Sequence, residues 1–206
     1  MAGAIEIKDH NSNVRLSLNA FGAAFIDTIN PISVQGTVTT VPGISSSVTG
    51  VYAFTVLDAP GVVAANNFVS LFNPIGSGKN LVLFGGSISS YIAGGGSTTK
   101  NSMQVQRVTA ASAGTLQATS AIAKFVSTYA NPVAEVRTGN PTVTLGANFI
   151  AAPPPINPNT NNYVYEIEPP PGVGPFLIVP GEGIVVRTAV GDTDQNWDIN
   201  IVWGEV

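Results

Sequence analysis

The sequence predicts an all-β protein, and three features of the chain carry that prediction. Short apolar or alternating segments recur at spacings of about 8 to 15 residues, which is typical of antiparallel sheets. The 22 glycines and 15 prolines separate these segments and favour turns between them. No strand pattern alternates with a helical pattern, and no internal repeat is visible, so a parallel α/β fold is not indicated. We therefore expect about eight to ten strands in an antiparallel β-sandwich.

Residues 1–50 are expected to form an extended N-terminal arm with one or two short strands. Val14–Leu18 alternates apolar and polar residues, and Gly36–Val41 is rich in β-branched residues, so both favour strands. Pro31, Pro42 and a run of three serines interrupt any longer element. A peripheral leader without regular structure fits these residues equally well. Residues 51–206 are expected to form the globular domain.

The stretch Phe68–Ile92 is expected to form the central hairpin of that domain. Pro74, Gly76 and Gly78 lie between two apolar runs and favour a reversal of the chain. Phe68–Phe72 is therefore expected to pair with Leu81–Phe84.

Further strands are expected where apolar or alternating runs lie between turn formers. They are Val51–Leu57, Ser102–Ala110, Ala134–Arg137, Thr142–Leu145, Tyr163–Ile167, Phe176–Val179 and Ile184–Arg187. Ala118–Phe125 has the best helix propensity in the chain, but its Thr, Ser and Val neighbours favour irregular structure or a strand. Proline-rich loops such as Ala152–Asn159 must run over the surface and cross between sheets, which favours a jelly roll.

The C-terminal run Trp197–Trp203 has the clearest two-residue period. Trp197, Ile199, Ile201 and Trp203 fall on one face of the predicted strand, and polar residues fall on the other. We expect a half-buried antiparallel strand with both tryptophans inward.

The composition favours extensive contact with other proteins. Charged residues make up 10% of the chain, compared with about 25% in an average soluble protein. The eight basic residues are scattered singly and the net charge is −4, so binding of nucleic acid through a basic patch is disfavoured. Cysteine is absent, which excludes disulfides and thiolate sites.

No targeting or membrane segment is expected. The first residues carry frequent charges and lack the apolar core of a signal peptide. No run of about 20 apolar residues could span a bilayer. The protein is expected to be made in a cytoplasm and to stay there or leave inside a larger particle.

The string Gly76-Ser77-Gly78-Lys79 has part of the composition of a nucleotide-binding P-loop. The spacing does not fit, because Asn73 occupies the position of the first glycine and Asn80 the position of the Ser or Thr that holds magnesium. A strand, not a helix, is expected to follow. We therefore interpret the string as a structural loop.

Asp192, Asp194 and Asn196 place oxygen ligands at alternate positions, as calcium loops do. Trp197 occupies the position that needs Gly, and Trp203 the position that needs a bidentate Glu. A solvated turn before the last strand is favoured over a metal site, although a weak calcium site completed by another loop fits the same residues.

The remaining candidate residues point to no catalytic, cofactor or metal site. His10 is the single histidine, and it is expected to be exposed and to have no catalytic role. Glu166 and Glu168 share one face of a strand like the paired acids of glycosidases, but a solvated strand end is the simpler interpretation. The tyrosines could line a sugar-binding surface or belong to the core and to interfaces; they are Tyr52, Tyr91, Tyr129, Tyr163 and Tyr165. We expect a protein that is not an enzyme.

Residues 50–206 resemble small virion proteins of tailed bacteriophages. The resemblance rests on the Asn73–Lys79 loop, the polar strand Met103–Val108, the Phe176–Arg187 unit that turns on Pro180-Gly181-Glu182-Gly183, and the ending Asn196–Trp203. The chain is most similar to capsid decoration, or cement, proteins with a jelly-roll domain. The motifs that carry this resemblance are mainly turns. They are informative about the fold, and they do not specify a place in the virion.

The resemblance implies a subunit on the outer surface of the phage head, commonly a homotrimer, that bridges copies of the major capsid protein. It brings no catalytic residues. The N-terminal arm and the loops Gly94–Thr99 and Pro153–Asn162 are the expected contacts, and the arm could add a strand to a neighbour. Because jelly rolls also serve in tails, baseplates and fibres, a receptor-binding or glycan-binding module is the alternative.

Overall fold

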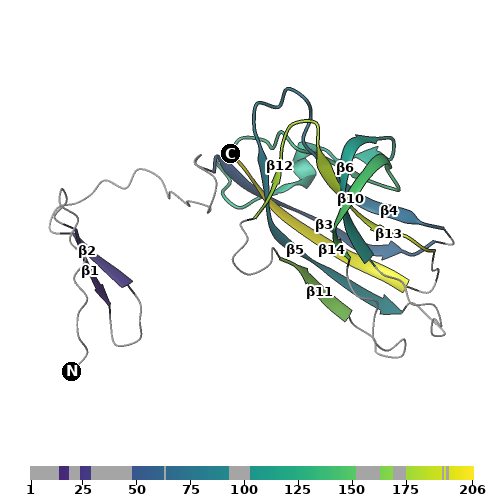
Figure 1. The fold of residues 1–206 in the computed structure, drawn as a ribbon, viewed down its shortest axis with the longest axis horizontal. Helices are drawn as coiled ribbons and strands as arrows, with labels where there is room; N and C mark the ends of the chain where they lie inside the picture. The colour runs from purple at the N-terminus through teal and green to yellow at the C-terminus, as the bar shows by residue number, and fades with distance from the viewer. Residues whose placement is uncertain are drawn as a thin grey trace. The chain divides into compact units, whose positions relative to one another are not determined.

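The computed structural model describes residues 14–18, 24–28, 48–62, 64–92, 103–151, 163–168, 175–191, 193 and 195–206. The chain divides into two compact units, Met1–Val38 and Thr39–Val206. In the first unit, β1 (Val14–Leu18) and β2 (Ala24–Thr28) form an antiparallel pair (Figure 1). The extended arm over residues 1–50 stays a prediction, because most of these residues lie outside the described ranges.

The second unit is a sandwich of two antiparallel sheets, which confirms the predicted all-β sandwich (Figure 1). Sheet 1 has the order β10 (Thr142–Ala151), β6 (Met103–Ser112), β13 (Gly183–Thr188), β4 (Asn66–Phe72), β9 (Glu135–Thr138) and β7 (Thr115–Leu116). Sheet 2 has the order β11 (Tyr163–Ile167), β5 (Leu81–Ile92), β14 (Gln195–Glu205), β3 (Gly50–Pro60) and β8 (Ala123–Lys124), and β12 (Phe176–Ile178) also pairs with β5. Within the described ranges the only helical element is the 3₁₀ turn Thr119–Ala121.

The long strands of this unit pair in a nested order. β3 pairs with β14, β4 with β13, β5 with β11, and β6 with β10. The first and third of these pairs lie in sheet 2, and the second and fourth lie in sheet 1. The strands of the second half therefore pair with those of the first half in reverse order, and successive pairs alternate between the two sheets. The more specific prediction of a jelly roll stays a prediction.

The predicted hairpin between Phe68–Phe72 and Leu81–Phe84 is wrong. β4 pairs with β13 and β9 in sheet 1, whereas β5 pairs with β14, β11 and β12 in sheet 2. The connection turns at Gly76 and Gly78, whose φ angles are 86° and 70°. It crosses from one sheet to the other and forms an arch. The reason is that each strand finds its partners far along the chain, not across the loop.

A second crossing follows β12. The strands around Pro180–Gly183 are present as predicted, but β12 lies in sheet 2 and β13 in sheet 1. The two crossings are bonded to each other. The Asn73 amide donates to the Glu182 carbonyl at 2.8 Å, and the Gly181 amide donates to the Asn73 carbonyl at 2.8 Å. Gly181 has a φ of 89°, a conformation that strains any residue with a side chain.

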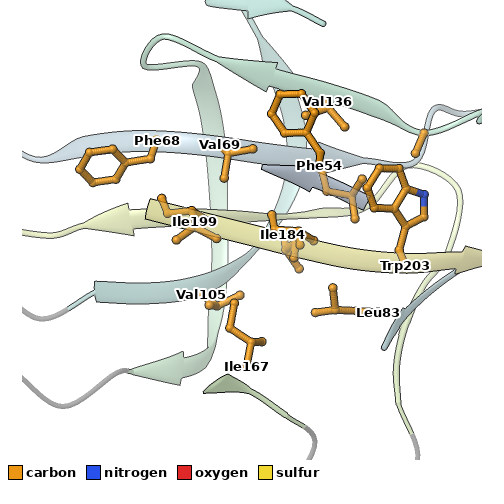
Figure 2. Packing of buried hydrophobic residues seen from close by; sticks show 14 of the residues in the cluster. Phe54, Phe68, Val69, Leu83, Val105, Val136, Ile167, Ile184, Ile199 and Trp203 are labelled. Carbon is orange, nitrogen blue, oxygen red and sulfur yellow. The ribbon is translucent and has the colours of Figure 1, made fainter. Parts of the chain in front are cut away.

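The core lies between the two sheets (Figure 2), and its sheet 2 half is dominated by β14. Trp197, Ile199, Ile201 and Trp203 are all at most 2% exposed, so the predicted inward face is confirmed. Tyr52 packs against Trp203 with ring centroids 5.8 Å apart. Each large side chain buried in this way contributes about 1.5–3 kcal/mol to folding.

Residues along β6 alternate between buried and partly buried only in its first half. Met103 and Val105 are buried two residues apart, but the next buried residue is Val108. Arg107 is half-buried and pairs with Glu182 at the second crossing. The regular alternation ends where β6 meets the irregular register of β10.

Candidate functional site

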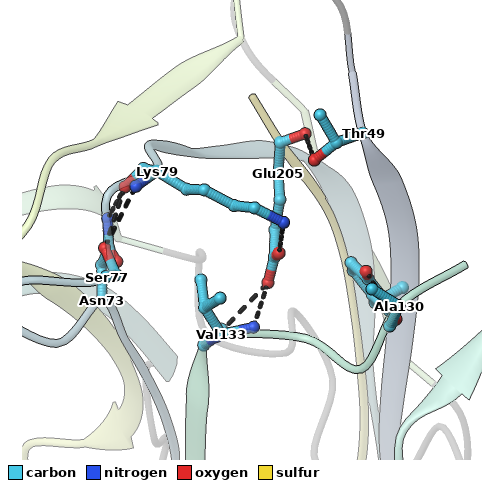
Figure 3. Close-up of polar contacts among 9 residues, drawn as sticks. Thr49, Asn73, Ser77, Lys79, Ala130, Val133 and Glu205 are labelled. Atoms are coloured by element: carbon cyan, nitrogen blue, oxygen red, sulfur yellow. Dashed lines mark hydrogen bonds and ion pairs between the residues drawn. The ribbon is translucent and has the colours of Figure 1, made fainter.

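Glu205 is a fully buried carboxylate at the end of β14 (Figure 3). Its Oε2 lies 2.9 Å from Nζ of Lys79. Its Oε1 accepts hydrogen bonds from the amides of Val133 at 2.6 Å and Ala134 at 3.3 Å. Its backbone carbonyl accepts from the amide of Thr49 at 2.6 Å. Glu205, on the last strand, therefore contacts three other segments: the residue before β3, the first arch and the loop before β9.

The sequence contains a signal for this buried carboxylate, although sequence reasoning did not use it. Trp197, Ile199, Ile201 and Trp203 face inward, and the same two-residue period places Glu205 on that face. A carboxylate at an inward position requires a cation and amide donors, because burial of an isolated charge is very unfavourable. Lys79 supplies the cation.

The Gly76–Lys79 loop is part of this structure. β5 begins at Leu81, so a strand follows the loop as expected. The Lys79 ammonium is engaged by Glu205, and the Ser77 hydroxyl hydrogen bonds to the Lys79 carbonyl at 3.1 Å. These contacts favour the interpretation of the string as a structural loop.

Asn73 fixes the first arch from inside the protein. Its side chain is buried, and its Nδ2 donates to the carbonyls of Lys79 at 2.8 Å and Ile178 at 3.1 Å. Both crossings between the sheets therefore depend on one amide side chain. The residue that stands in the place of a P-loop glycine thus has a structural function.

Tyr52 lies beside the same cluster. Its hydroxyl donates to the carbonyl of Ala130 at 3.0 Å. Burial raises the pKa of the Tyr52 hydroxyl, and the charge of Glu205 and the neighbouring Tyr129 raise that pKa further. The hydroxyl is therefore held in its neutral, donating form.

A groove of about 420 Å³ lies at one end of the sandwich, between the two sheets. The end of β3, the start of β4 and the turn after β9 line it; the main lining residues are Leu57, Asp58, Val62, Asn66, Phe68 and Asn140. Asp58 has a φ of 53°, and its amide donates to Oδ1 of Asp198 at 2.7 Å. The strand bulges here, because the pairing of β3 with β14 shifts register between Trp197 and Ile199. A bulge beside a groove can redirect a side chain, and Leu57 is 71% exposed.

The candidate calcium ligands are only partly described. Asp192 and Asp194 lie outside the described residues. Asn196 donates from Nδ2 to Oδ1 of Asp58, so its side chain takes part in the contacts beside the groove. Within the described ranges, no group of three or more His, Cys, Asp or Glu side chains could hold a metal ion.

The other candidate residues lie apart from one another. Glu166 and Glu168 are exposed, as a solvated strand end predicts. Tyr52 belongs to the core, and Tyr129 and Tyr165 are partly buried against it. His10 and the side chains of Tyr91 and Tyr163 lie outside what the structure describes, as do the expected contact loops Gly94–Thr99 and Pro153–Asn162.

Three exposed apolar side chains lie at or beside the two crossings: Ile75 on the first arch, Leu177 on β12 and Val179 directly after β12. Ile75, Leu177 and Val179 are 88%, 38% and 39% exposed, and we call them the loop patch. They stand on the two segments that Asn73 holds together, and a Cβ atom on Gly181 would lie 3.3 Å from Cγ1 of Ile75. This arrangement is suited to binding through apolar contact.

Comparisons with protein-family models, with curated proteins and with solved structures found no match. No helix in the described part of the chain is long and apolar enough to cross a membrane.

Proposed function

We propose that the protein is a non-enzymatic structural protein of a tailed-bacteriophage virion, a decoration or cement protein on the outer surface of the head. The observation that carries this proposal is the loop patch. Ile75 is 88% exposed, yet the arch that bears it is fixed by the buried Asn73 and by the Lys79–Glu205 ion pair. A rigid loop that holds apolar side chains in water is typical of a surface that another protein covers.

The rest of the molecule supports the same function. The chain has 10% charged residues and a net charge of −4, which leaves a largely neutral surface. Within this proposal the domain is a jelly roll, since nested pairing that alternates between two sheets is expected when a long hairpin is wound into two Greek keys. The resemblance of residues 50–206 to cement proteins adds to these observations.

The proposed partner is the major capsid protein, and the proposed assembly is a homotrimer bound at the junctions between capsomers. Each copy then contributes a modest contact area. Many symmetric copies, each with two or more contacts, would resist the pressure of packaged DNA by avidity.

Capsids that lack this protein provide the test. After mixing with the purified protein, the heads should withstand a higher temperature before they release DNA, and cryo-electron microscopy should show density over capsomer junctions. Density at the tail or baseplate with none over the capsomers would contradict the proposal.

The second candidate is a tail, baseplate or fibre component that binds a receptor or glycan. Tyr165 favours it, because this aromatic side chain is only partly buried on β11, beside the exposed Glu166. A glycan array tests it, and binding that disappears in Tyr165→Ala would support it. An array without reproducible signals would remove that support.

A further inference from the structure

The two sheets of the sandwich are unequal on one side. Beyond β4, sheet 1 continues with β9 (four residues) and then β7. Beyond β3, sheet 2 continues only with β8, which has two residues. β8 pairs with Tyr52 and Ala53, and past Ala53 no strand in the described ranges lies beside β3 on that side. Among the described residues, the β3 edge from Phe54 onward therefore has no β partner on this side.

The backbone of β3 presents hydrogen-bonding groups along this edge. The amide of Phe125 donates to the carbonyl of Val51 at 3.0 Å, so the carbonyl of Val51 points toward the β8 side. In an antiparallel strand the same orientation recurs at every second residue. The backbone N–H and C=O of Thr55 consequently point outward from this edge, away from β14. Thr55 is also exposed.

The groove adjoins the same edge. Its lining includes Leu57 and Pro60 from β3, and Phe68 and Thr138 from sheet 1. The groove thus lies between the end of β3 in sheet 2 and the β4 and β9 part of sheet 1. A strand added beside β3 would find backbone partners at Thr55 and a pocket for alternate side chains in the groove, which is how sheet edges bind extended segments.

We propose that the β3 edge from Phe54 to the bulge at Asp58 binds residues Gly36–Val41 of a second copy of this chain as an added antiparallel strand. This inference rests on the proposed function, because it names the contact by which copies on the virion join. The segment Gly-Thr-Val-Thr-Thr-Val has high β propensity and ends at Pro42. It carries no charge, so it can lie beside Asp58 and Asp198 without a buried like charge. Exchange of a strand between identical copies joins subunits at low cost in new structure.

Cysteine cross-linking of the full-length protein tests the contact, because the natural chain has no cysteine. One preparation carries Thr55→Cys, and the other carries Val38→Cys, Thr39→Cys or Thr40→Cys. Facing residues of antiparallel strands have Cα atoms about 5.5 Å apart or closer, which a disulfide can bridge. At least one mixture should give a disulfide between different chains in about tenfold higher yield than mixtures with Thr144→Cys, an exposed threonine on β10.

Other cross-linking results would overturn the proposal. A disulfide that forms only within chains carrying both substitutions would place the segment on its own sandwich. Disulfides between two Thr55→Cys chains alone would indicate direct pairing of two β3 edges. Yields equal to those of the Thr144→Cys control would indicate no contact.

A backbone variant provides a second readout in the full-length protein. Thr55→Pro removes the edge-facing amide, while Thr55→Ala keeps it. Far-ultraviolet circular dichroism should be the same for both, and self-association measured by sedimentation should be about tenfold weaker for Thr55→Pro alone. Equal self-association would overturn the proposal. Neither assay uses capsids, so the two proposals can fail separately. Capsid binding without strand exchange would contradict this inference alone, and strand exchange without capsid binding would contradict the cement function alone.

Discussion

The ammonium of Lys79 lies 2.9 Å from the buried carboxylate of Glu205, although 126 residues separate them along the chain. Lys79→Met keeps most of the apolar stem and removes the charge. The buried carboxylate then lacks its cation, so we expect the free energy of unfolding to fall by about 2 kcal/mol in a urea titration.

The matched control for this pair is Glu135→Gln. The Glu135–Arg137 pair is also 2.9 Å long, but the Glu135 side chain is 35% exposed. Its loss should change the free energy of unfolding by less than about 1 kcal/mol. Equal effects of the two substitutions would contradict a special role for the buried pair.

Tyr52 should make the protein less stable in alkali. Its pKa is raised above the ordinary value of 10.0, mainly by burial and then by Glu205 and Tyr129. The folded state therefore holds the Tyr52 proton more tightly than the unfolded state does. The contribution of this hydroxyl to the free energy of unfolding is complete below pH 10 and is lost as the pH rises toward the folded pKa. Unfolding midpoints measured from pH 8 upward should show a fall that is weaker in Tyr52→Phe. An unchanged fall in that variant would assign the alkaline effect to other groups.

Asn73→Ala should destabilise the protein by about 2 kcal/mol, because it leaves two carbonyls without their donor inside the protein. The carbonyls are those of Lys79 and Ile178. Thermal or urea unfolding measures the change. Ser77→Ala, which removes a partly buried hydroxyl of the same arch, serves as the control and should cost less than about 1 kcal/mol.

Removal of the last ten residues should prevent folding. β14 pairs with β3 on one side and β5 on the other, so its loss would split sheet 2 and empty the core of both tryptophans. The expected result is an aggregated product without a cooperative melting transition. A soluble truncated chain that melts cooperatively would refute this prediction.

Ile75→Asp should weaken binding to capsids without loss of stability. Ile75 is 88% exposed, so the melting temperature should hardly change, while burial of a charge in the proposed interface should weaken binding by about tenfold or more. Val190→Asp is the control, since Val190 is 61% exposed beyond the opposite end of β13. Equal binding by the two variants would exclude the loop patch as the contact.

The strands could be predicted from local sequence, but their partners could not. The inward face of Trp197–Trp203 follows from the two-residue period alone, and the burial of all four apolar residues confirms it. A hairpin and an arch between sheets have the same local pattern of strand, turn and strand. What distinguishes them is the pairing of β4 with β13 and of β5 with β14, and these contacts lie far away in the sequence.

The contacts around Glu205 show the same difference between what the local sequence indicates and what only the structure reveals. The period along β14 indicates that Glu205 faces inward, but nothing near it in the sequence identifies Lys79 as its partner. The interpretation of Gly76–Lys79 as a structural loop followed from its spacing, whereas the role of Asn73 required the structure. The groove is likewise assembled from residues 56–68 and from the distant turn at residues 138–140.

The nested pairing implies an order for the folding reaction. The innermost pair joins Ser112 to Thr142, while the outermost joins Gly50 to Glu205. Closing a loop costs more conformational entropy as the loop lengthens, and each inner pair shortens the loop that the next pair must close. Formation of β6–β10 should therefore precede docking of β3 on β14, and the high contact order should make folding slow for a domain of this size. A chain still being synthesised cannot close its outermost pair until β14 has been made.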